Sequence, residues 1–244
     1  MFLELSKESN FKKTYFEMLK YRLAFASLEL EGISDDLSDI KQSIKIYNQL
    51  NAINYMFDTH KEESLSHYEF TNLLCNVAEK VTGEEINNFR TTTAYVNGSS
   101  VERSKPQMIR NDLWYLIDDY NYRIENCKNE KEFFEIEADF HIRFLHIHPF
   151  EDGNGRVARI LLAYNMSKHS IAPCIITKEI KKEYCDMIEN SDTKKLAELF
   201  EELSKKELDT MVSLYKELDE KGLIEDNYMS DKQLEEYEKV KGLK

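Results

Sequence analysis

Glycine and proline, the two residues that most often interrupt helices, are scarce in this sequence. Seven glycines among 244 residues amount to about 3%, where ordinary proteins have about 7%, and there are only three prolines. With so few turn residues beside plentiful Glu, Lys and Leu, the composition predicts a mainly helical protein. The length allows a sizeable core, arranged as one large domain or one domain with appendages.

Other absences narrow the compartment and the class of partner. The four cysteines form no CxxC pair, so the sequence predicts neither a zinc site nor a disulfide framework, and we expect reduced thiols in a cytoplasmic protein. The start of the sequence has no basic signal segment and no run approaches 18 apolar residues, so we expect neither export nor membrane insertion. A net charge of -13 argues against nucleic acid and anionic lipid as partners. An anionic ligand must therefore be held at a site whose local charge differs from the negative charge of the whole chain.

Apolar residues at three- and four-residue steps predict a succession of helices. The first carries Phe11, Tyr15, Leu19 and Leu23 and is expected to end at Gly32. Further helices are expected at residues 35–57, 68–81, 108–125, 131–147, from 156 onward, 178–190, 193–220 and 231–241. The one strand signal, Thr91 to Val96, is rich in β-branched and aromatic residues and runs into Asn97-Gly98, a strong hairpin turn.

The segment from His148 to Arg159 carries the chemistry. Gly153-Asn154-Gly155 directly precedes an amphipathic helix, where free backbone N–H groups and the helix dipole favour an anion. Arg156 and Arg159 project from one face of that helix, where cations oppose the dipole but suit a polyphosphate. Asp152 could hold a divalent metal that bridges phosphate oxygens, and His148 is a general base near neutral pH. Together these residues predict phosphoryl or nucleotidyl transfer.

Two plainer interpretations compete with this one. The glycines could form a simple turn between two helices, with the arginines on a solvated face. Alternatively, His146, His148 and Asp152 could be the metal ligands of a hydrolase, although His-x-His spacing suits a strand better than the helix expected through Leu145. His141 and His146, which lie among apolar residues, are interpreted as core or supporting histidines.

The same segment resembles the signature of the Fic (filamentation induced by cAMP) family, His-x-Phe-x-Asp/Glu-Gly-Asn-Gly-Arg-x-x-Arg, and matches every fixed position. The likeness covers about Asp35 to Phe200. It implies a compact Fic-type helical bundle with a small β-hairpin flap near the active site. It also divides the chain into an N-terminal inhibitory helix region at residues 1–34, a catalytic core at 35–200 and a C-terminal helical extension at 201–244.

The resemblance further implies that AMP is transferred from ATP to a Ser, Thr or Tyr hydroxyl of a target protein or of the protein itself. His148 would take the proton from that hydroxyl, Phe150 would anchor the loop in the core, and Asp152 would hold Mg²⁺ on the α- and β-phosphates. The phosphates themselves would be bound by five residues, namely Gly153, Asn154 and Gly155, which line an anion hole, and Arg156 and Arg159, which contact the β- and γ-phosphates.

Two further elements follow from the same resemblance. Ser27-Leu28-Glu29-Leu30-Glu31-Gly32 is similar to the family's inhibitory motif, in which the glutamate, here Glu31, pairs with Arg159 and Ser27 fixes the helix by hydrogen bonding. An ordinary solvated acid on a packing helix is the plainer interpretation of Glu31. The segment Arg90 to Pro106 is similar to the flap that binds the target's backbone by strand addition. Its expected target contacts are Thr93, Ala94, Tyr95 and Val96.

The base and the reaction stay open at this point. Tyr184 could stack on an adenine, or it could be a core aromatic at helical spacing with Ile180 and Ile188. The favoured function is an autoinhibited protein adenylyltransferase that uses ATP and magnesium, with a homo-oligomer allowed. The alternatives are removal of AMP, transfer of another phosphate-linked group at the same site, and a non-enzymatic helical interaction module whose acidic surface suits basic partners.

Overall fold

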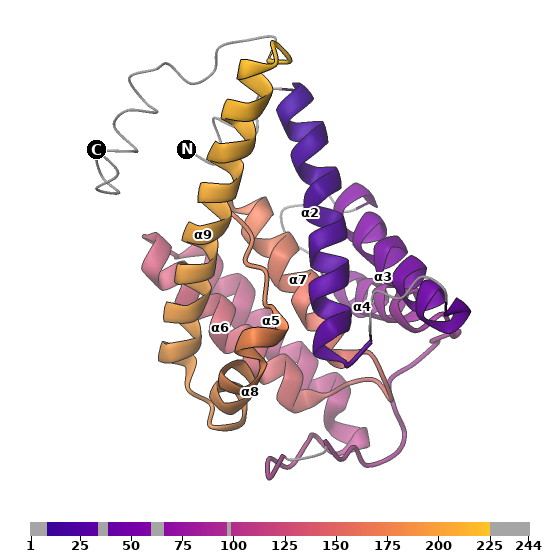
Figure 1. Cartoon of the computed structure of the whole chain (residues 1–244). Coiled ribbons are helices and arrows are strands. Elements are labelled where there is room, and N and C mark those ends of the chain that lie inside the picture. Colours follow the sequence, from indigo (N-terminus) through magenta and orange to yellow (C-terminus); the bar gives the residue numbers. More distant parts are fainter. Residues whose placement is uncertain (1–8, 34–38, 60–65, 97–98, 225–244) are drawn as a thin grey trace.

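The computed structural model describes residues 9–33, 39–59, 66–96 and 99–224, and the described part is a bundle of helices (Figure 1). The α-helices are α2 (Ser9–Leu30), α3 (Ile40–Thr59), α4 (His67–Thr82), α5 (Ile109–Glu125), α6 (Glu130–Ile147), α7 (Asn154–Lys168), α8 (Lys181–Glu189) and α9 (Thr193–Glu220). Two short 3-10 turns, η1 (Pro106–Met108) and η2 (Lys178–Ile180), precede α5 and α8. None of the helices within these ranges is long and apolar enough to cross a membrane.

The predicted helices are confirmed wherever the structure describes them, and their ends follow local signals. Ser66 and Glu69 form a capping box at the start of α4, and Gly83 takes a left-handed conformation at its end. Gly32, with φ +74°, follows the last turn of α2 in the same way, as predicted. The helix expected at residues 231–241 lies outside the described residues.

The centre of the bundle is formed by α6 and α7, which join at the His148 to Gly153 loop. Most of α7 is buried, and its apolar side chains pack against α2, α3 and α4, while α6 packs against α5 and α9. A buried carboxylate links three of these helices: Glu137 on α6 accepts hydrogen bonds from Tyr120 Oη at 2.6 Å and from Asn165 Nδ2 at 3.2 Å. Burial raises the pKa of Glu137 to about 7. The loop is therefore held between two well-packed helices.

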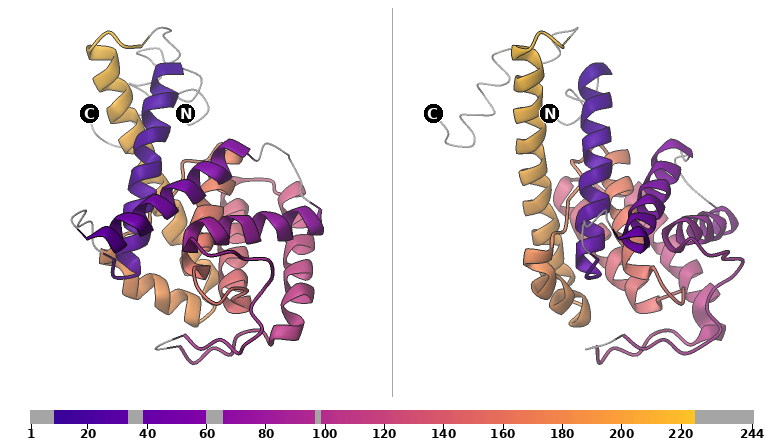
Figure 2. Two further views of the ribbon diagram at one scale, coloured as in Figure 1. Left: turned by 90° about the vertical axis from the view of Figure 1, so that its right-hand side faces the viewer. Right: turned by 45° about the vertical axis from the view of Figure 1, so that its right-hand side comes forward.

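The segment between α4 and α5 differs from the predicted hairpin. In the parts of it that the structure describes, residues 91–96 and 99–105, no residue is in a β-strand, and Asn97 and Gly98 lie outside the described residues. The two arms are extended and lie at the edge of the bundle (Figure 2), with Tyr95 90% exposed. A single pair of strands is marginal in water, so β propensity alone does not produce a ladder here. The segment is called the flap segment below, from Arg90 to Pro106.

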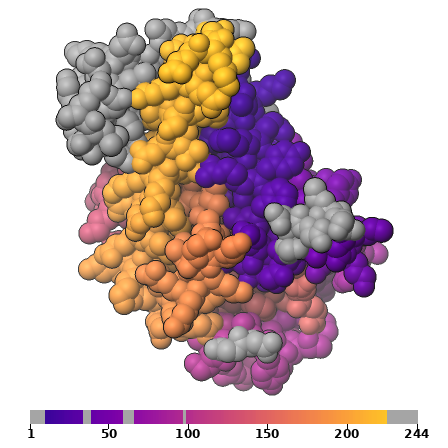
Figure 3. Space-filling view, viewed as in Figure 1, coloured from indigo at the N-terminus to yellow at the C-terminus, as the bar shows by residue number. Residues whose placement is uncertain are grey.

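The long helices α2 and α9 lie side by side along one face of the molecule (Figures 1 and 3). A buried polar cluster joins them: Glu207 on α9 accepts hydrogen bonds from Tyr15 Oη at 2.9 Å and from Arg22 Nη1 at 2.8 Å. The boundary predicted between residues 200 and 201 falls inside α9, which is continuous from Thr193 to Glu220. The first part of the predicted C-terminal extension, up to Glu220, thus packs against α2 through Glu207.

Candidate active site

His148 ends α6 in a conformation that turns the chain sharply. Its backbone has φ 52° and ψ 62°, the left-handed region that costs a residue other than glycine about 1–2 kcal/mol. The Nδ1 atom of its ring lies 3.2 Å from the Leu145 carbonyl oxygen. With a proton on Nδ1 donated to that carbonyl, Nε2 is left as the basic nitrogen. Local backbone geometry therefore selects which ring nitrogen can accept a proton.

The surroundings of His148 favour its neutral form. Burial is the largest effect and lowers the pKa of the imidazole below its usual value of 6.5, although the hydrogen bond to the Leu145 carbonyl opposes it. The cations of Arg103 and Arg90 lower the pKa further, and Asp152 raises it slightly. A neutral imidazole with a lowered pKa is already in the form that a general base needs near pH 7.

Asn154 holds the loop that follows His148. Its Oδ1 accepts a hydrogen bond from the Phe150 N–H at 2.9 Å, and its Nδ2 donates to the Phe150 carbonyl at 2.8 Å. Phe150 is 1% exposed and its ring packs beside that of Phe89. The anchoring role expected of Phe150 is in accord with this burial. Asn154, expected to line an anion hole, makes its side-chain contacts within the loop.

The two glycines are required by close packing. Gly153 has φ +86°, and a Cβ there would lie 3.1 Å from Val81 Cγ1. A Cβ on Gly155 would lie 3.0 Å from Arg159 Nη1 and 3.1 Å from Glu31 Oε1. No side chain caps the start of α7, and its first turn contains no acidic residue. An anion could therefore approach the backbone N–H groups at this helix end.

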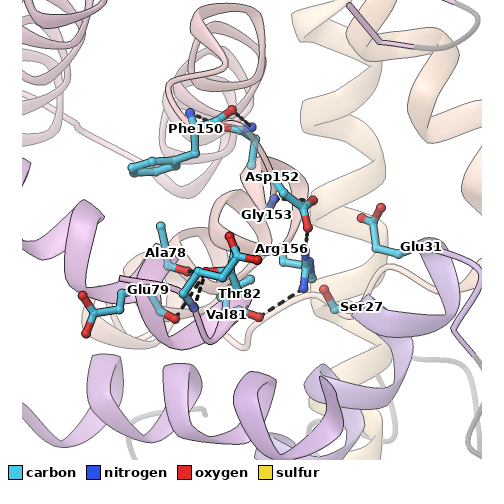
Figure 4. A network of polar contacts seen from close by, with 12 residues as sticks. Ser27, Glu31, Ala78, Glu79, Val81, Thr82, Phe150, Asp152, Gly153 and Arg156 are labelled. Atoms are coloured by element: carbon cyan, nitrogen blue, oxygen red, sulfur yellow. Dashed lines mark hydrogen bonds and ion pairs between the residues drawn. The ribbon is translucent and has the colours of Figure 1, made fainter. Parts of the chain in front are cut away.

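Arg156 is held within the loop region (Figure 4). Its Nη2 donates to Asp152 Oδ2 at 2.7 Å and its Nη1 donates to the Val81 carbonyl at 3.1 Å, and the residue is only 6% exposed. Burial alone would raise the pKa of Asp152, but Arg156 and the Gly153 N–H hold it below its usual value. Arg156 and Asp152 are thus both charged at the mouth of the site.

Arg159 is bound by the end of α2. Its Nη2 donates to Glu31 Oε1 at 2.7 Å and to the Ser27 carbonyl at 3.1 Å, and its Nε donates to Ser27 Oγ at 2.9 Å. Ser27 is buried, whereas the side chain of Glu31 is 41% exposed. Figure 4 shows both residues at the end of α2, beside the loop. The structure thus brings together the pair that the sequence comparison with the family motif anticipated.

Tyr184 lies behind this arginine in the core. It is 3% exposed, and its hydroxyl lies 2.6 Å from His141 Nε2. Burial raises the pKa of Tyr184, and burial with the nearby Arg159 cation lowers the pKa of His141 to about 3. A side chain enclosed in this way has no open face for a nucleobase. The placement agrees with the core interpretation of Tyr184 and not with an adenine contact.

The ligand set proposed for a hydrolase metal is not assembled. His146 Nε2 lies 2.9 Å from the Ile188 carbonyl, and the described residues contain no group of three or more His, Cys, Asp or Glu side chains that could hold a metal ion. Asp152 is a single carboxylate whose side chain is 77% exposed. That fits Mg²⁺, which is often held by one or two protein carboxylates together with substrate phosphates.

One buried arginine of the site has no signal in the sequence. Arg90, placed by sequence only at the start of the flap segment, is 4% exposed, and its Nε donates to the His148 carbonyl at 2.6 Å. Nothing in its local pattern distinguishes it from a surface arginine, because three of its four acceptors are backbone carbonyls farther along the chain, in Ser104, Ile147 and His148.

The residues therefore combine one base, the buried cations Arg156 and Arg159 and a helix N-terminus around one loop. This arrangement can bind a polyphosphate and accept a proton from a hydroxyl beside it. The chemistry needs little more than positioning and charge neutralisation.

Comparisons with known proteins show which family and fold this chain resembles. Residues 65–166 match the family described as Fic/DOC. A protein adenylyltransferase Fic of Culex quinquefasciatus is 31% identical over 106 residues, which cover 41% of this chain and 19% of that protein. A Fic domain containing signaling protein from Bacteroides thetaiotaomicron has a similar fold, with a TM-score of 0.74 and 16% identity over 88% of this chain and 95% of that one. The structure of residues 134–508 of Fic-1 from C. elegans has a TM-score of 0.65 and 19% identity, and the match covers 90% of this chain and 67% of that one. The match spans less than a fifth of the first two curated relatives.

Proposed function

Residues 65–166 form a domain of the Fic/DOC family, and from that premise we propose that the protein transfers AMP from ATP to a hydroxyl side chain of a target protein. The observation that carries the proposal is the protonation geometry of His148. Its Nδ1 is directed at the Leu145 carbonyl, so Nε2 is free to act as a base beside the start of α7 and its two arginines.

The transfer is a displacement at the α-phosphorus. The hydroxyl oxygen of the target forms a bond to that phosphorus, the bond to the oxygen that bridges the α- and β-phosphates breaks, and pyrophosphate leaves. His148 Nε2 takes the hydroxyl proton. The N–H groups around Gly153 to Gly155, with Arg156 and Arg159, would hold the phosphate oxygens and offset their charge.

Asp152 is the residue that would hold Mg²⁺, and the bound ion would supply further neutralisation of phosphate charge. The carboxylate is ionised because Arg156 and the Gly153 N–H keep its pKa low. Asn154 fixes the loop through contacts within the protein, so the position for the triphosphate would be formed by the protein itself.

We infer that Glu31 keeps this site at low activity. Glu31 forms a 2.7 Å ion pair with Arg159, and Ser27 accepts two further hydrogen bonds from the same guanidinium. A γ-phosphate that needs Arg159 must displace a carboxylate of like charge. The flap segment, in which Thr93 and Tyr95 are exposed and Ala94 and Val96 are half-buried, would receive the target backbone. Self-modification is a second route of the same chemistry.

The test is a mass spectrum of the protein and of lysate proteins after incubation with magnesium and ATP. Wild-type protein, Glu31→Gly and His148→Ala are compared. Glu31→Gly should raise the amount of protein carrying an added AMP by about tenfold or more, within the usual range of coupling between two sites. His148→Ala should abolish the added mass, because the hydroxyl loses its base.

A matched control distinguishes loss of the Glu31–Arg159 ion pair from a general loosening of α2. Glu29 lies two residues before Glu31 and pairs with Lys178 at 2.6 Å instead of Arg159. Glu29→Gly should therefore give much less activation than Glu31→Gly. If no variant yields the AMP mass on any protein, the transferase proposal fails; equal activation by both glycine variants would instead refute the role of the Glu31 ion pair.

A further inference from the structure

The guanidinium of Arg90 donates hydrogen bonds to four backbone carbonyls, those of Thr92, Ser104, Ile147 and His148. Its Nε donates to the His148 carbonyl at 2.6 Å and its Nη2 donates to the Ile147 carbonyl at 3.1 Å. Both acceptors lie at the C-terminal end of α6, where carbonyl groups lack partners within the helix and favour a cation. One guanidinium therefore caps the turn in which the catalytic histidine takes its left-handed conformation.

The same guanidinium holds both arms of the flap segment. Nη1 donates to the Thr92 carbonyl at 2.6 Å on the outgoing arm, and Nη2 also donates to the Ser104 carbonyl on the returning arm. The backbone adds to the junction, because the Arg90 N–H donates to the Pro149 carbonyl at 2.9 Å and the Ser104 N–H to the His146 carbonyl at 3.3 Å. The flap segment and the His148 turn are thus joined through one buried side chain.

The tip of the flap segment is held elsewhere. Arg103 and Ser99, on the returning arm, both contact Glu189 at the end of α8, with Arg103 Nη2 2.9 Å from Glu189 Oε1. Those contacts fix the arm to α8 and include no backbone atom of residues 146–149. Thr92 Oγ1 also donates to the Glu151 carboxylate at 2.9 Å, but that contact likewise includes no backbone atom of residues 146–149. Among the described residues, Arg90 is therefore the flap side chain that reaches the backbone of the catalytic turn.

We propose that Arg90 is a positioning residue, which couples the flap segment to the backbone of His148 so that a target held by the flap segment is aligned with the base. This inference rests on the proposed function. It predicts that loss of Arg90 impairs transfer to the acceptor but spares ATP binding, because the phosphate site is held by separate contacts of Asn154, Arg156 and Gly153.

The experiment uses the Glu31→Gly protein as the parent, with Arg90→Ala and Arg90→Lys added. Transfer from ATP labelled at the α-phosphate is measured on the acceptor found in the mass spectra, and binding of magnesium with a non-hydrolysable ATP analogue is measured by calorimetry. Arg90→Ala should lower the turnover number by about 100-fold, as a displacement of about 1 Å can. The dissociation constant of the ATP analogue should change less than about threefold in both variants. The turnover number of Arg90→Lys should lie between that of Arg90→Ala and that of the parent.

The pH profile, compared between Arg90→Ala and Arg90→Lys, separates the loss of the Arg90 charge from a loss of packing. The charged groups that act on the His148 imidazole are Arg90, Arg103 and Asp152, beside its hydrogen bond to the Leu145 carbonyl. Because the Arg90 cation lowers the pKa of His148, Arg90→Ala should shift the acid limb of the transfer rate to higher pH. Arg90→Lys keeps the charge and should leave the limb near the parent position.

Arg110→Ala is the matched control. Arg110 is exposed, contacts Asn88 just before the flap segment at 2.8 Å, and packs over Phe89. It should leave turnover within about twofold. The inference is overturned if Arg90→Ala keeps the parent's turnover, or if Arg90→Lys loses ATP binding and thermal stability in parallel with transfer.

A readout independent of transfer keeps the two proposals distinguishable. In amide hydrogen exchange, Arg90→Lys should speed exchange at residues 146–150 and in the described flap arms together, and Arg110→Ala should not. If the parent transfers no AMP, the proposed function fails, and the exchange result alone still decides whether Arg90 joins the two segments. Unchanged exchange at residues 146–150 would refute that coupling.

Discussion

Arg156 and Arg159 lie three residues apart on α7, and each has a guanidinium paired with a carboxylate, but their partners come from different parts of the chain. Arg156 pairs with Asp152, four residues earlier, and with the end of α4. Arg159 pairs with Glu31 and Ser27, which are 128 and 132 residues away. The first pair belongs to the architecture of the loop. The second joins α7 to a separate helix, α2.

The largest expected effect comes from breaking the local pair. Arg156→Ala, made in the Glu31→Gly background, should lower transfer of labelled AMP by about 100- to 1,000-fold, because a preorganised cation at the phosphates is lost. Arg143→Ala serves as the control, since Arg143 pairs with Asp119 and Asp139 on the partly exposed faces of α5 and α6. Retention of most activity by Arg156→Ala would remove Arg156 from the site.

A smaller effect is expected from loosening α2 at a distance from Arg159. Glu207→Ala removes the acceptor that Tyr15 and Arg22 share, and so weakens the contact between α2 and α9. Transfer should rise by about two- to fivefold, less than with Glu31→Gly, and the free energy of unfolding should fall by about 1–3 kcal/mol. Label transfer and thermal unfolding measure the two effects.

The control for this variant is Glu202→Ala, which removes an exposed pair with Lys206 on the same helix. It should change neither transfer nor stability appreciably. In the Glu31→Gly background Glu207→Ala should give no further gain, because both changes act through the same ion pair. Additive gains would mean that α9 influences the site by another route.

The smallest expected difference is in the pH profiles of wild type and Glu31→Gly. The acid limb of transfer should fall below pH 6.5 in both, because the base is His148, whose pKa is lowered by burial and by Arg103 and Arg90. As pH falls through that pKa, Nε2 gains a proton and transfer stops. Glu31→Gly should raise the maximum rate of transfer without moving the pH of the acid limb. A shift of the acid limb would mean that Glu31 takes part in the proton transfer.

The helices and the loop were predictable because their signals are local. The start of α7 follows from Gly153 to Gly155, and the end of α2 from Gly32, where backbone conformations favour glycine. The flap segment was predicted as a hairpin from β-branched residues, but the described arms form no strand, because strands need a partner surface that local propensity does not supply. Tyr184 shows the same limit, since helical spacing did not distinguish a core aromatic from one at the surface.

The sequence by itself determined which residues meet in the loop, since one histidine, one carboxylate, two glycines and two arginines within twelve residues constrain one another through short-range geometry. Only the tertiary structure decided that Arg159 meets Ser27 and Glu31, that Arg90 reaches the carbonyl of His148, and that α9 supports α2 through Glu207. Each of these contacts joins residues far apart in the chain. Such contacts depend on how whole helices pack, which no local pattern specifies.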